Sequence, residues 1–290
     1  MTVIATHGLT KDFGAVRAVD GLDLTVERGE IFGYLGPNGA GKTTTIRLLL
    51  DFLRPTAGSA RVLGEVVGDA AGRRRIGYMP AELRFDDHYT ADDIVEFYGT
   101  LRGGVDRAFV DGLMQRFALD PRRRFGELST GNRRKIGLVQ AFMHEPELLL
   151  LDEPTSGLDP LLQHEFHLLL RETVANGATV FLSSHVLHEV EQLADRVGIL
   201  RAGTLVTVTT IAELRRRARQ RLVLHVRGKA DAAPFARLPG VVEATADHRV
   251  ITVVVKGSVE KVLRTAAEMH VHRIESRETD LEDVFLELYR

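Results

Sequence analysis

The residues with the clearest chemical capacity form a glycine-rich segment near the N-terminus. Residues 36–43 read GPNGAGKT and match the pattern GxxxxGK[ST]. An apolar stretch at 31–35 precedes the segment, and apolar residues at helical spacing follow it. Glycines let backbone N–H groups approach phosphate oxygens, the lysine adds a mobile positive charge, and the threonine hydroxyl can ligate Mg²⁺. We therefore expect a strand, a phosphate-binding loop and a helix here.

The expected phosphate-binding residues are those of this loop and of the helical turn after it. They are Gly36, Pro37, Asn38, Gly39, Ala40, Gly41, Lys42, Thr43 and Thr44. Within this set, Lys42 is placed for the terminal phosphates of a nucleotide and Thr43 for the metal ion. A glycine-rich turn with an unrelated lysine is the alternative, and the strand–loop–helix context argues against it.

Two acids follow a second expected strand. Residues 147–154 read ELLLLDEP, and such a run of leucines is typical of a strand buried on both faces of a parallel sheet. Asp152 and Glu153 fall where that strand ends, at the edge where open α/β sheets bind ligands. We expect Asp152 to hold Mg²⁺, directly or through water, and Glu153 to orient and deprotonate an attacking water. Taken alone, the segment could equally be a strand followed by solvated loop acids.

A histidine closes a further apolar segment. Residues 178–184 read ATVFLSS and are followed by His185. At the C-terminal end of a strand, this imidazole could touch the γ-phosphate and anchor the catalytic water or the glutamate. The chain has 11 histidines, so position rather than residue type distinguishes this one.

The order of these segments resembles the ATP-binding subunit of an ABC transporter. The resemblance covers residues 1 to about 210, and it rests on GPNGAGKTT (36–44), LSTGN (128–132), LLLLDEP (148–154), SGLD (156–159) and LSSH (182–185). It implies an α/β fold, a P-loop NTPase core with antiparallel β and helical subdomains. It also implies an ATPase that uses ATP and Mg²⁺.

In this family two such domains pack head to tail, with ATP between the phosphate loop of one and the signature loop of the other. The resemblance therefore implies a homodimer in which the Ser129 hydroxyl and the Gly131 N–H reach the partner's γ-phosphate, and Asp159 crosses the interface. The residues agree in part, because Ser129 is a good N-cap for the helical pattern at 132–145 and a helix N-terminus favours an anion. Phe13 is implied to stack on adenine, with a core phenylalanine at a strand end as the alternative.

The sequence departs from the family pattern at two places. The family's glutamine-bearing loop usually follows a strand like RRIGYMP (74–80), and here Ala81 and then Glu82 come next. A methyl group cannot ligate magnesium, so Glu82 substitutes, a water bridges the gap, or hydrolysis is slower. Thr130 and Asn132 replace the usual glycine and glutamine of the signature.

These variations resemble a subgroup of exporter ATPases that work with separately encoded permeases, such as drug, antibiotic or lipid exporters. The resemblance implies a multi-span membrane permease as partner and a position on the cytoplasmic face of the cell membrane. Residues 81–100 sit where the family's permease-facing surface lies. Direction of transport comes only from this resemblance, and the cargo is not encoded in this chain.

Composition limits the other possibilities. The 290 residues include no cysteine, which excludes disulfides, thiolate metal sites and a cysteine nucleophile. No apolar run approaches the roughly 20 residues that cross a bilayer, and we expect no signal peptide. A formal net charge of −2 gives no general attraction to nucleic acid, so we expect no nucleic-acid partner.

The pattern along the chain predicts a small second domain. An ATP-binding domain is expected at 1–210, with a helical signature subdomain at about 86–145, and a basic linker helix at 211–220. Residues 221–290 then read as an α+β accessory domain, ferredoxin-like in its alternation: strands at 221–228, 249–257 and 272–278, and helices at 259–270 and 281–289. This domain carries no motif with assignable chemistry.

Two other functions compete with the exporter hypothesis. A soluble ABC ATPase acting on ribosomes would carry two cassettes in one chain, and a DNA-repair member would carry a long coiled coil between phosphate loop and signature. This chain has one set of motifs and no room for such an insertion. A P-loop kinase is disfavoured because Glu153 and LSTGN serve water attack and dimer closure rather than a second substrate.

Overall fold

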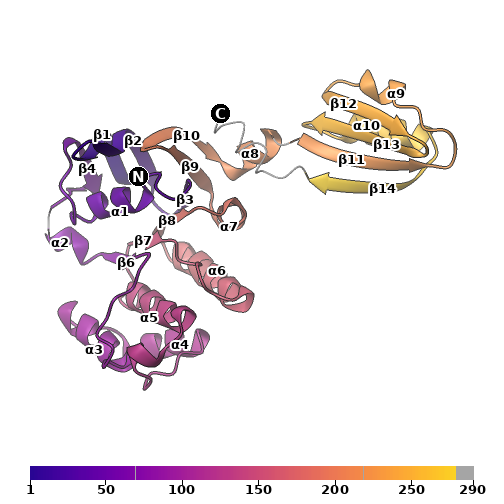
Figure 1. Ribbon diagram of the computed structural model, residues 1–290. Helices are drawn as coiled ribbons and strands as arrows, with labels where there is room; N and C mark the ends of the chain where they lie inside the picture. The colour runs from indigo at the N-terminus through magenta and orange to yellow at the C-terminus, as the bar shows by residue number, and fades with distance from the viewer. Residues whose placement is uncertain (69, 218, 279–290) are drawn as a thin grey trace. The chain divides into compact units, whose positions relative to one another are not determined.

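The chain forms two compact units, residues 1–208 and 209–290. A computed structural model describes residues 1–68, 70–217 and 219–278 (Figure 1). Within these residues, no helix is long and apolar enough to cross a membrane. Each unit is described by itself below.

A six-stranded sheet forms the centre of the first unit, in the order β10-β9-β3-β8-β7-β6. Its strands are β3 (Ile31–Leu35), β6 (Ile76–Met79), β7 (Leu148–Asp152), β8 (Thr179–Ser184), β9 (Arg196–Arg201) and β10 (Thr204–Thr210). Strand β3 pairs in parallel with β8 and β9, and β7 pairs in parallel with β6 and β8. The four leucines of β7 are fully buried, which confirms the prediction of a strand covered on both faces.

Four helices accompany this sheet: α1 (Lys42–Leu49), α2 (Ala70–Arg73), α6 (Pro160–Ala175) and α7 (Leu187–Leu193). Helix α1 directly follows β3 and packs near β7, while α6 and α7 lie against β8 (Figure 1). Aromatic rings of neighbouring strands pack against each other: Phe32 of β3 and Phe181 of β8 form a stacked pair with centroids 5.7 Å apart. The phosphate loop is therefore held between a buried strand and a helix anchored to the same core.

A second, antiparallel sheet has the order β2-β1-β4-β5. Its strands are β1 (Thr2–Phe13), β2 (Val16–Glu27), β4 (Ala57–Val62) and β5 (Glu65–Val66). Leu9 and Leu24 from this sheet share one buried cluster with Phe32 of β3 and Ile46 of α1. The two sheets thus enclose α1, and the β1–β2 hairpin lies beside the start of that helix.

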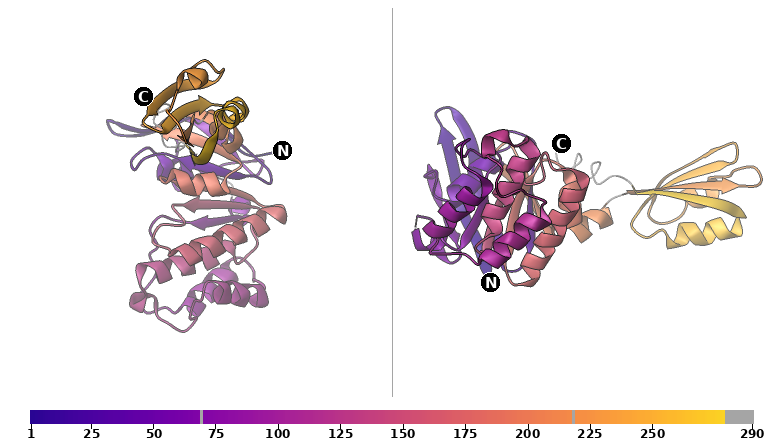
Figure 2. Two further views of the ribbon diagram at one scale, coloured as in Figure 1. Left: turned by 90° about the vertical axis from the view of Figure 1, so that its right-hand side faces the viewer. Right: turned by 90° about the horizontal axis from the view of Figure 1, so that it is seen from below.

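Helices occupy the stretch where the sequence predicts a helical subdomain: α3 (Ala91–Leu101), α4 (Arg107–Arg116), a 3₁₀ turn (Phe125–Glu127) and α5 (Thr130–Phe142). Their starts follow the side-chain chemistry of N-caps. Thr90 and Asp93 form a capping box, and the Asp106 carboxylate accepts from two backbone N–H groups of α4. Figure 2 shows these helices gathered at the end of the unit away from the β1–β2 hairpin.

The second unit contains an antiparallel sheet in the order β12-β13-β11-β14. After α8 (Ile211–Arg217) come β11 (Arg219–Val226), α9 (Ala233–Ala236), β12 (Val241–Asp247), β13 (Val250–Lys256), α10 (Glu260–Glu268) and β14 (Val271–Glu278). The β-α-β-β-α-β order and this strand arrangement are ferredoxin-like. Side chains from one face of β11 and β13 pack with Phe235 of α9 and Val262 of α10.

This unit differs from the sequence expectation in several details. The linker helix ends at Arg217, and β11 begins at Arg219, two residues before the expected start of the accessory domain. Strand β12 and the short α9 were not predicted, because VVEATAD carries few of the residues that favour strands. The helix predicted at 281–289 lies outside the described residues.

Candidate active site

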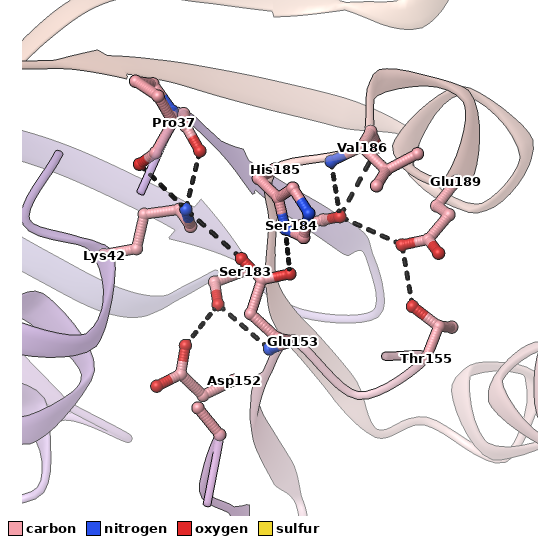
Figure 3. Close-up of polar contacts among 12 residues, drawn as sticks. Pro37, Lys42, Asp152, Glu153, Thr155, Ser183, Ser184, His185, Val186 and Glu189 are labelled. Atoms are coloured by element: carbon pink, nitrogen blue, oxygen red, sulfur yellow. Dashed lines mark hydrogen bonds and ion pairs between the residues drawn. The ribbon is translucent and has the colours of Figure 1, made fainter. Parts of the chain in front are cut away.

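The candidate site lies at the C-terminal edge of the parallel sheet. Because β3, β7 and β8 are parallel neighbours, the segments that follow them meet at that edge. These are the glycine-rich loop, the acid pair and the LSSH segment, which Figure 3 shows converging. Three motifs separated along the chain thus become one cluster.

The phosphate loop has the geometry of an anion-binding turn. Gly41 adopts φ 105°, and a Cβ there would lie 2.3 Å from the carbonyl oxygen of Ala18. Only glycine therefore fits at this position. The N-cap of α1 is Gly41, and no side chain in the described part of the chain caps this end, so the first N–H groups of the helix stay available to an anion. Thr43 and Thr44 stand in the first turn of α1, both partly exposed.

Lys42 is the buried cation of the site, with only 6% of its side chain exposed. Its Nζ donates to the carbonyl oxygens of Gly36 at 2.6 Å and Pro37 at 3.1 Å. The same nitrogen forms an ion pair with Glu153 Oε1 at 3.2 Å. These contacts hold the ammonium across the loop, where phosphate oxygens would compete for it (Figure 3).

Glu153 connects the other two motifs. Its Oε2 accepts from His185 Nδ1 at 2.8 Å, while Oε1 faces Lys42. Its backbone has φ 50°, an uncommon conformation for a residue with a side chain, and such strain costs on the order of 1–3 kcal/mol. The chain turns sharply here, directly after β7, and this turn brings the Glu153 carboxylate into contact with Lys42 on one side and His185 on the other. Backbone strain of this kind is often found at functional positions.

Asp152 is fully buried at the end of β7. Its Oδ1 accepts a hydrogen bond from Ser183 Oγ at 2.6 Å, and Oδ2 has no partner among the described residues. An unpartnered buried carboxylate oxygen is costly unless a cation or water satisfies it. A hard oxygen donor beside a phosphate loop fits Mg²⁺, which prefers carboxylate and hydroxyl oxygens.

Ser183 is a site residue that the sequence reasoning did not single out. Besides bonding Asp152, its Oγ accepts from the backbone N–H of Glu153 at 3.2 Å. The neighbouring Ser184 has a different partner, because its hydroxyl donates a hydrogen bond to Glu189 Oε2 at 3.0 Å. The available signal was the position of Ser183 within LSSH, opposite Asp152 in the register of β7 and β8.

The signature segment begins a helix as predicted. Ser129 is the N-cap of α5, and its Oγ accepts from the N–H of Asn132 at 3.4 Å. Asp159 caps α6 in the same way, accepting from the N–H groups of Leu161 and Leu162 at 3.0 Å each. Both caps are exposed, and both belong to the set predicted to act in trans.

The signature loop and the loop before α6 touch each other. A Cβ at Gly131 would lie 2.9 Å from the carbonyl oxygen of Gly157, closer than side-chain carbons approach in proteins. The two loops predicted to face a partner's nucleotide therefore form one continuous surface on this subunit. This close approach requires glycine at position 131.

The remaining predicted residues lie at the periphery. Phe13 ends β1 and is 47% exposed, so it is not the core phenylalanine of the alternative explanation. The ammonium of Lys11 lies 5.2 Å from the centroid of its ring.

The loop that departs from the family pattern contacts the signature helix through its backbone. The carbonyl oxygen of Ala81 accepts a hydrogen bond from Arg134 at 3.0 Å. The Glu82 carboxylate is 79% exposed and pairs with Arg84.

Comparisons with protein families and with individual relatives all point to one family. Residues 19–156 match the family described as ABC transporter, and residues 210–289 match the C-terminal domain of ATP-binding proteins like DrrA1-3. The chain is 35% identical over 295 residues to the bacitracin transport ATP-binding protein BcrA of Enterococcus faecalis, covering 99% of this chain and 96% of that protein. It is 38% identical over 304 residues to the daunorubicin resistance ATP-binding protein DrrA3 of Streptomyces coeruleorubidus, again covering 99% and 96%.

The fold agrees with a solved relative. The structure of an ATP-binding subunit of an ABC transporter superposes with a TM-score of 0.69 at 29% identity, covering 74% of this chain and 92% of that one. The match with BcrA and DrrA3 spans both units of the chain rather than the cassette alone. The chain therefore belongs to the family of ATP-binding, ATP-hydrolysing subunits of ABC transporters.

Proposed function

We propose that this ATPase drives export of a drug-like or antibiotic compound through a separately encoded membrane permease, from the cytoplasmic face of the membrane. The observation that carries the proposal is the match of both units to BcrA and DrrA3, whose names state bacitracin transport and daunorubicin resistance. The names of these relatives state transport or drug resistance, and they give no support to a ribosome- or DNA-directed ATPase. The cargo itself would be selected by the permease.

The proposed hydrolytic step uses the cluster around Glu153. The carboxylate accepts a proton from water as that water attacks the γ-phosphorus and the bond from this phosphorus to the bridging oxygen of ADP breaks. His185 holds the carboxylate through the 2.8 Å contact. The N–H groups of the glycine-rich loop and Lys42 bind the phosphates. Asp152 and Thr43 would hold Mg²⁺, which, when bound, neutralises charge on the phosphate oxygens.

A second copy of the chain completes the proposed site. Ser129 and Gly131 of one copy would contact the γ-phosphate held by the other, and Asp159 would cross the same interface. Exposure of both helix caps and the contact between Gly131 and Gly157 support this arrangement, since they present one surface to a partner. The N-terminus of α5, 13 residues long, adds a favourable dipole for an anion. ATP would close the dimer and hydrolysis would open it.

The proposed permease-binding surface is a groove of about 680 Å³ beside the helical region. Its lining combines aromatic rings, such as Phe52, Phe85 and Tyr98, with the guanidinium groups of Arg47 and Arg102. Phe52 is 57% exposed, and its ring packs edge-on against Tyr78 of the same lining, with the centroids 5.6 Å apart. Such a surface suits a short amphipathic helix carrying acidic residues, as a cytoplasmic loop of a permease could supply.

Affinity purification from gently solubilised membranes tests this function. The wild-type chain should retain a polytopic membrane protein in stoichiometric amount, identified by mass spectrometry. The variant Phe52→Glu should lose that protein while keeping ATP hydrolysis without the permease, because Phe52 lies outside the nucleotide site. Ribosomal proteins or DNA-repair factors in place of a membrane protein would overturn the proposal.

A further inference from the structure

Glu189 is an acid beside the candidate site that the hydrolytic chemistry described above does not use. It stands in the first turn of α7, where it is partly buried. Its Oε2 accepts two hydrogen bonds, from Thr155 Oγ1 at 2.7 Å and from Ser184 Oγ at 3.0 Å (Figure 3). Hydrogen bonds to a carboxylate are among the stronger ones in proteins. One oxygen atom of Glu189 thus joins two separate segments of the chain.

The two hydroxyl groups that reach this oxygen are shielded from water. Only 3% of Thr155 and 1% of Ser184 is exposed. The Ser184 hydroxyl also lies 3.4 Å from the carbonyl oxygen of Val186, so the carboxylate is its closer acceptor. A buried hydroxyl that loses its acceptor destabilises the fold, and both side chains therefore favour the arrangement in which they bond Glu189.

Each of the joined segments carries one member of the pair formed by Glu153 and His185. Thr155 follows Glu153 by two residues in the turn after β7, and Ser184 directly precedes His185 at the end of β8. The side chains of Glu153 and His185 meet at 2.8 Å. Glu189 consequently holds the two backbones that present this contact, and a shift of either backbone would change its distance.

Backbone pairing between β7 and β8 ends before these positions. The last paired residues of the two strands are Asp152 and Ser183. Thr155 and Ser184 lie beyond that pair, where they are connected through the carboxylate of Glu189. The carboxylate therefore continues the connection between the two segments past the end of the strand pairing.

Helix α7 gives Glu189 a firm support. Val190 is fully buried, and a Cβ at Gly33 of β3 would lie 2.3 Å from Val190 Cγ1, so the helix packs closely on that strand. Leu187 and Leu193 of the same helix are buried as well. Side chains carried by a packed helix hold their partners more accurately than side chains of a loop.

We propose that Glu189 is a positioning residue for hydrolysis: by accepting from Thr155 and Ser184, it fixes the distance between Glu153 and His185. A displacement of about 1 Å at a reacting group can lower a rate by about 100-fold, so small changes in this distance matter. The inference rests on the proposed hydrolytic roles of Glu153 and His185. It does not depend on the permease.

The test compares Glu189→Leu and Glu189→Gln with the wild-type protein in ATPase assays. Glu189→Leu removes the acceptor at similar volume, and it should lower kcat by at least about 10-fold with KM for ATP changed by less than about 3-fold. Glu189→Gln keeps an amide oxygen that can accept both hydroxyl groups, so its kcat should stay within about 3-fold of wild type. Rescue by this variant separates the hydrogen bonds from a general effect of mutating α7.

Glu213→Leu is the matched control. Glu213 also stands in the first turn of a helix, α8, and its Oε2 accepts from Thr209 Oγ1 at 2.9 Å. It belongs to the second unit of the chain, so we expect its loss to leave kcat and KM unchanged.

The hydroxyl donors supply milder variants that test the same contact if Glu189→Leu does not fold. Thr155→Val and Ser184→Ala each remove one of the two hydrogen bonds and should each lower kcat by at least about 3-fold. Ser184→Ala should leave the Mg²⁺ concentration for half-maximal activity unchanged, because its partner is Glu189 and not the acid pair. A smaller loss of kcat in both variants overturns the proposal.

A double-mutant cycle with His185→Ala locates the effect. If Glu189 acts through the contact of Glu153 with His185, Glu189→Leu should lower kcat by less than about 3-fold once that contact is gone. The same loss in both backgrounds would show that Glu189 acts elsewhere and overturns the proposal. So would a loss below about 10-fold in Glu189→Leu alone, or a kcat for Glu189→Gln as low as that for Glu189→Leu.

Failure of the proposed hydrolytic roles would look different. His185→Ala would then hydrolyse ATP at the wild-type rate, whatever the effect of Glu189→Leu. If His185→Ala is impaired and Glu189→Leu is not, the positioning role alone is wrong. Absence of a permease from the affinity purification would overturn the export function and leave these kinetics on the isolated ATPase unaffected.

Discussion

Ser183 donates its hydroxyl hydrogen to Asp152 across neighbouring strands, at a distance of 2.6 Å. The bond occupies one oxygen of the buried carboxylate and leaves the other, Oδ2, without a partner among the described residues. Ser183 also receives the N–H of Glu153, so one hydroxyl orients both acids. Residues that hydrogen-bond a metal-ligating side chain in this way are often nearly as necessary for metal binding as the ligating residue itself.

Ser183→Ala should therefore weaken the use of Mg²⁺ by the enzyme. We expect the Mg²⁺ concentration for half-maximal ATPase activity to rise by about 10-fold, as is typical when an outer partner of a metal ligand is removed. Titrating Mg²⁺ at saturating ATP measures this. Ser184→Ala is the matched control, because its hydroxyl bonds Glu189 and not the acid pair. Equal effects of the two variants would contradict the role of Ser183.

Glu153→Gln should separate ATP binding from hydrolysis. The amide keeps the shape of the side chain but cannot accept the proton of the attacking water, so we expect a loss of kcat of at least about 100-fold. Removing the charge also reduces repulsion with the γ-phosphate, and ATP should then trap a stable dimer. Light scattering with and without ATP measures this. A variant that stays monomeric at saturating ATP would count against the proposed trans site.

Ser129→Arg and Lys42→Ala should complement each other when mixed. A bulky cation on the signature surface blocks its use by a partner, and loss of Lys42 disables the phosphate loop of its own chain. Each homodimer should be inactive, whereas the mixed dimer pairs the intact loop of one variant with the intact signature of the other. ATPase assays of the mixture should show up to about a quarter of wild-type activity if chains mix at random. An inactive mixture in which mixed dimers are detected would rule out a site shared between chains.

His144 makes stability depend on pH. It is partly buried, its Nε2 lies 3.2 Å from the carbonyl oxygen of Ile76, and burial together with the charge of Arg102 lowers its pKa to about 4. The folded protein therefore keeps the ring neutral where the unfolded chain takes up a proton. The contribution of His144 to the free energy of unfolding is complete above the ordinary histidine pKa of about 6.5, and it is lost as pH falls from there toward about 4.

His144→Gln should remove that dependence while keeping a donor for Ile76. Between about pH 7.5 and 5 we expect wild type to lose about 1–2 kcal/mol more than the variant, a figure reduced for partial solvent exposure of the ring. Urea unfolding followed by circular dichroism at both pH values gives the difference between the two proteins. Parallel losses in wild type and variant would show that another group is responsible.

The sequence predicted those parts of the fold that depend on local pattern. Three elements follow from residue type and spacing: the buried strand at Leu148–Leu151, the helix after the glycine-rich loop and the Ser129 cap. A strand buried on both faces requires apolar residues throughout, and a helix N-cap favours a few small polar residue types. Strand β12 escaped prediction, since its alternation is weak and pairing with β13 holds it in place.

Contacts between distant segments were harder to foresee. Ser183 and Asp152 are 31 residues apart, and Arg134 and Ala81 are 53 apart, so each pairing depends on how strands and helices pack. Serine beside a strand end and arginine in a helix are common, and their types alone carry little information. The family resemblance supplied the residues that are expected to touch nucleotide, but not the residues that hold them in place.

The closeness of Gly131 to the carbonyl oxygen of Gly157 limits which residues position 131 can accept. A Cβ there would lie 2.9 Å from that oxygen, so even alanine would push the signature loop away from the loop before α6. The spacing of these two loops on the surface of the subunit therefore depends on the absence of a single methyl group.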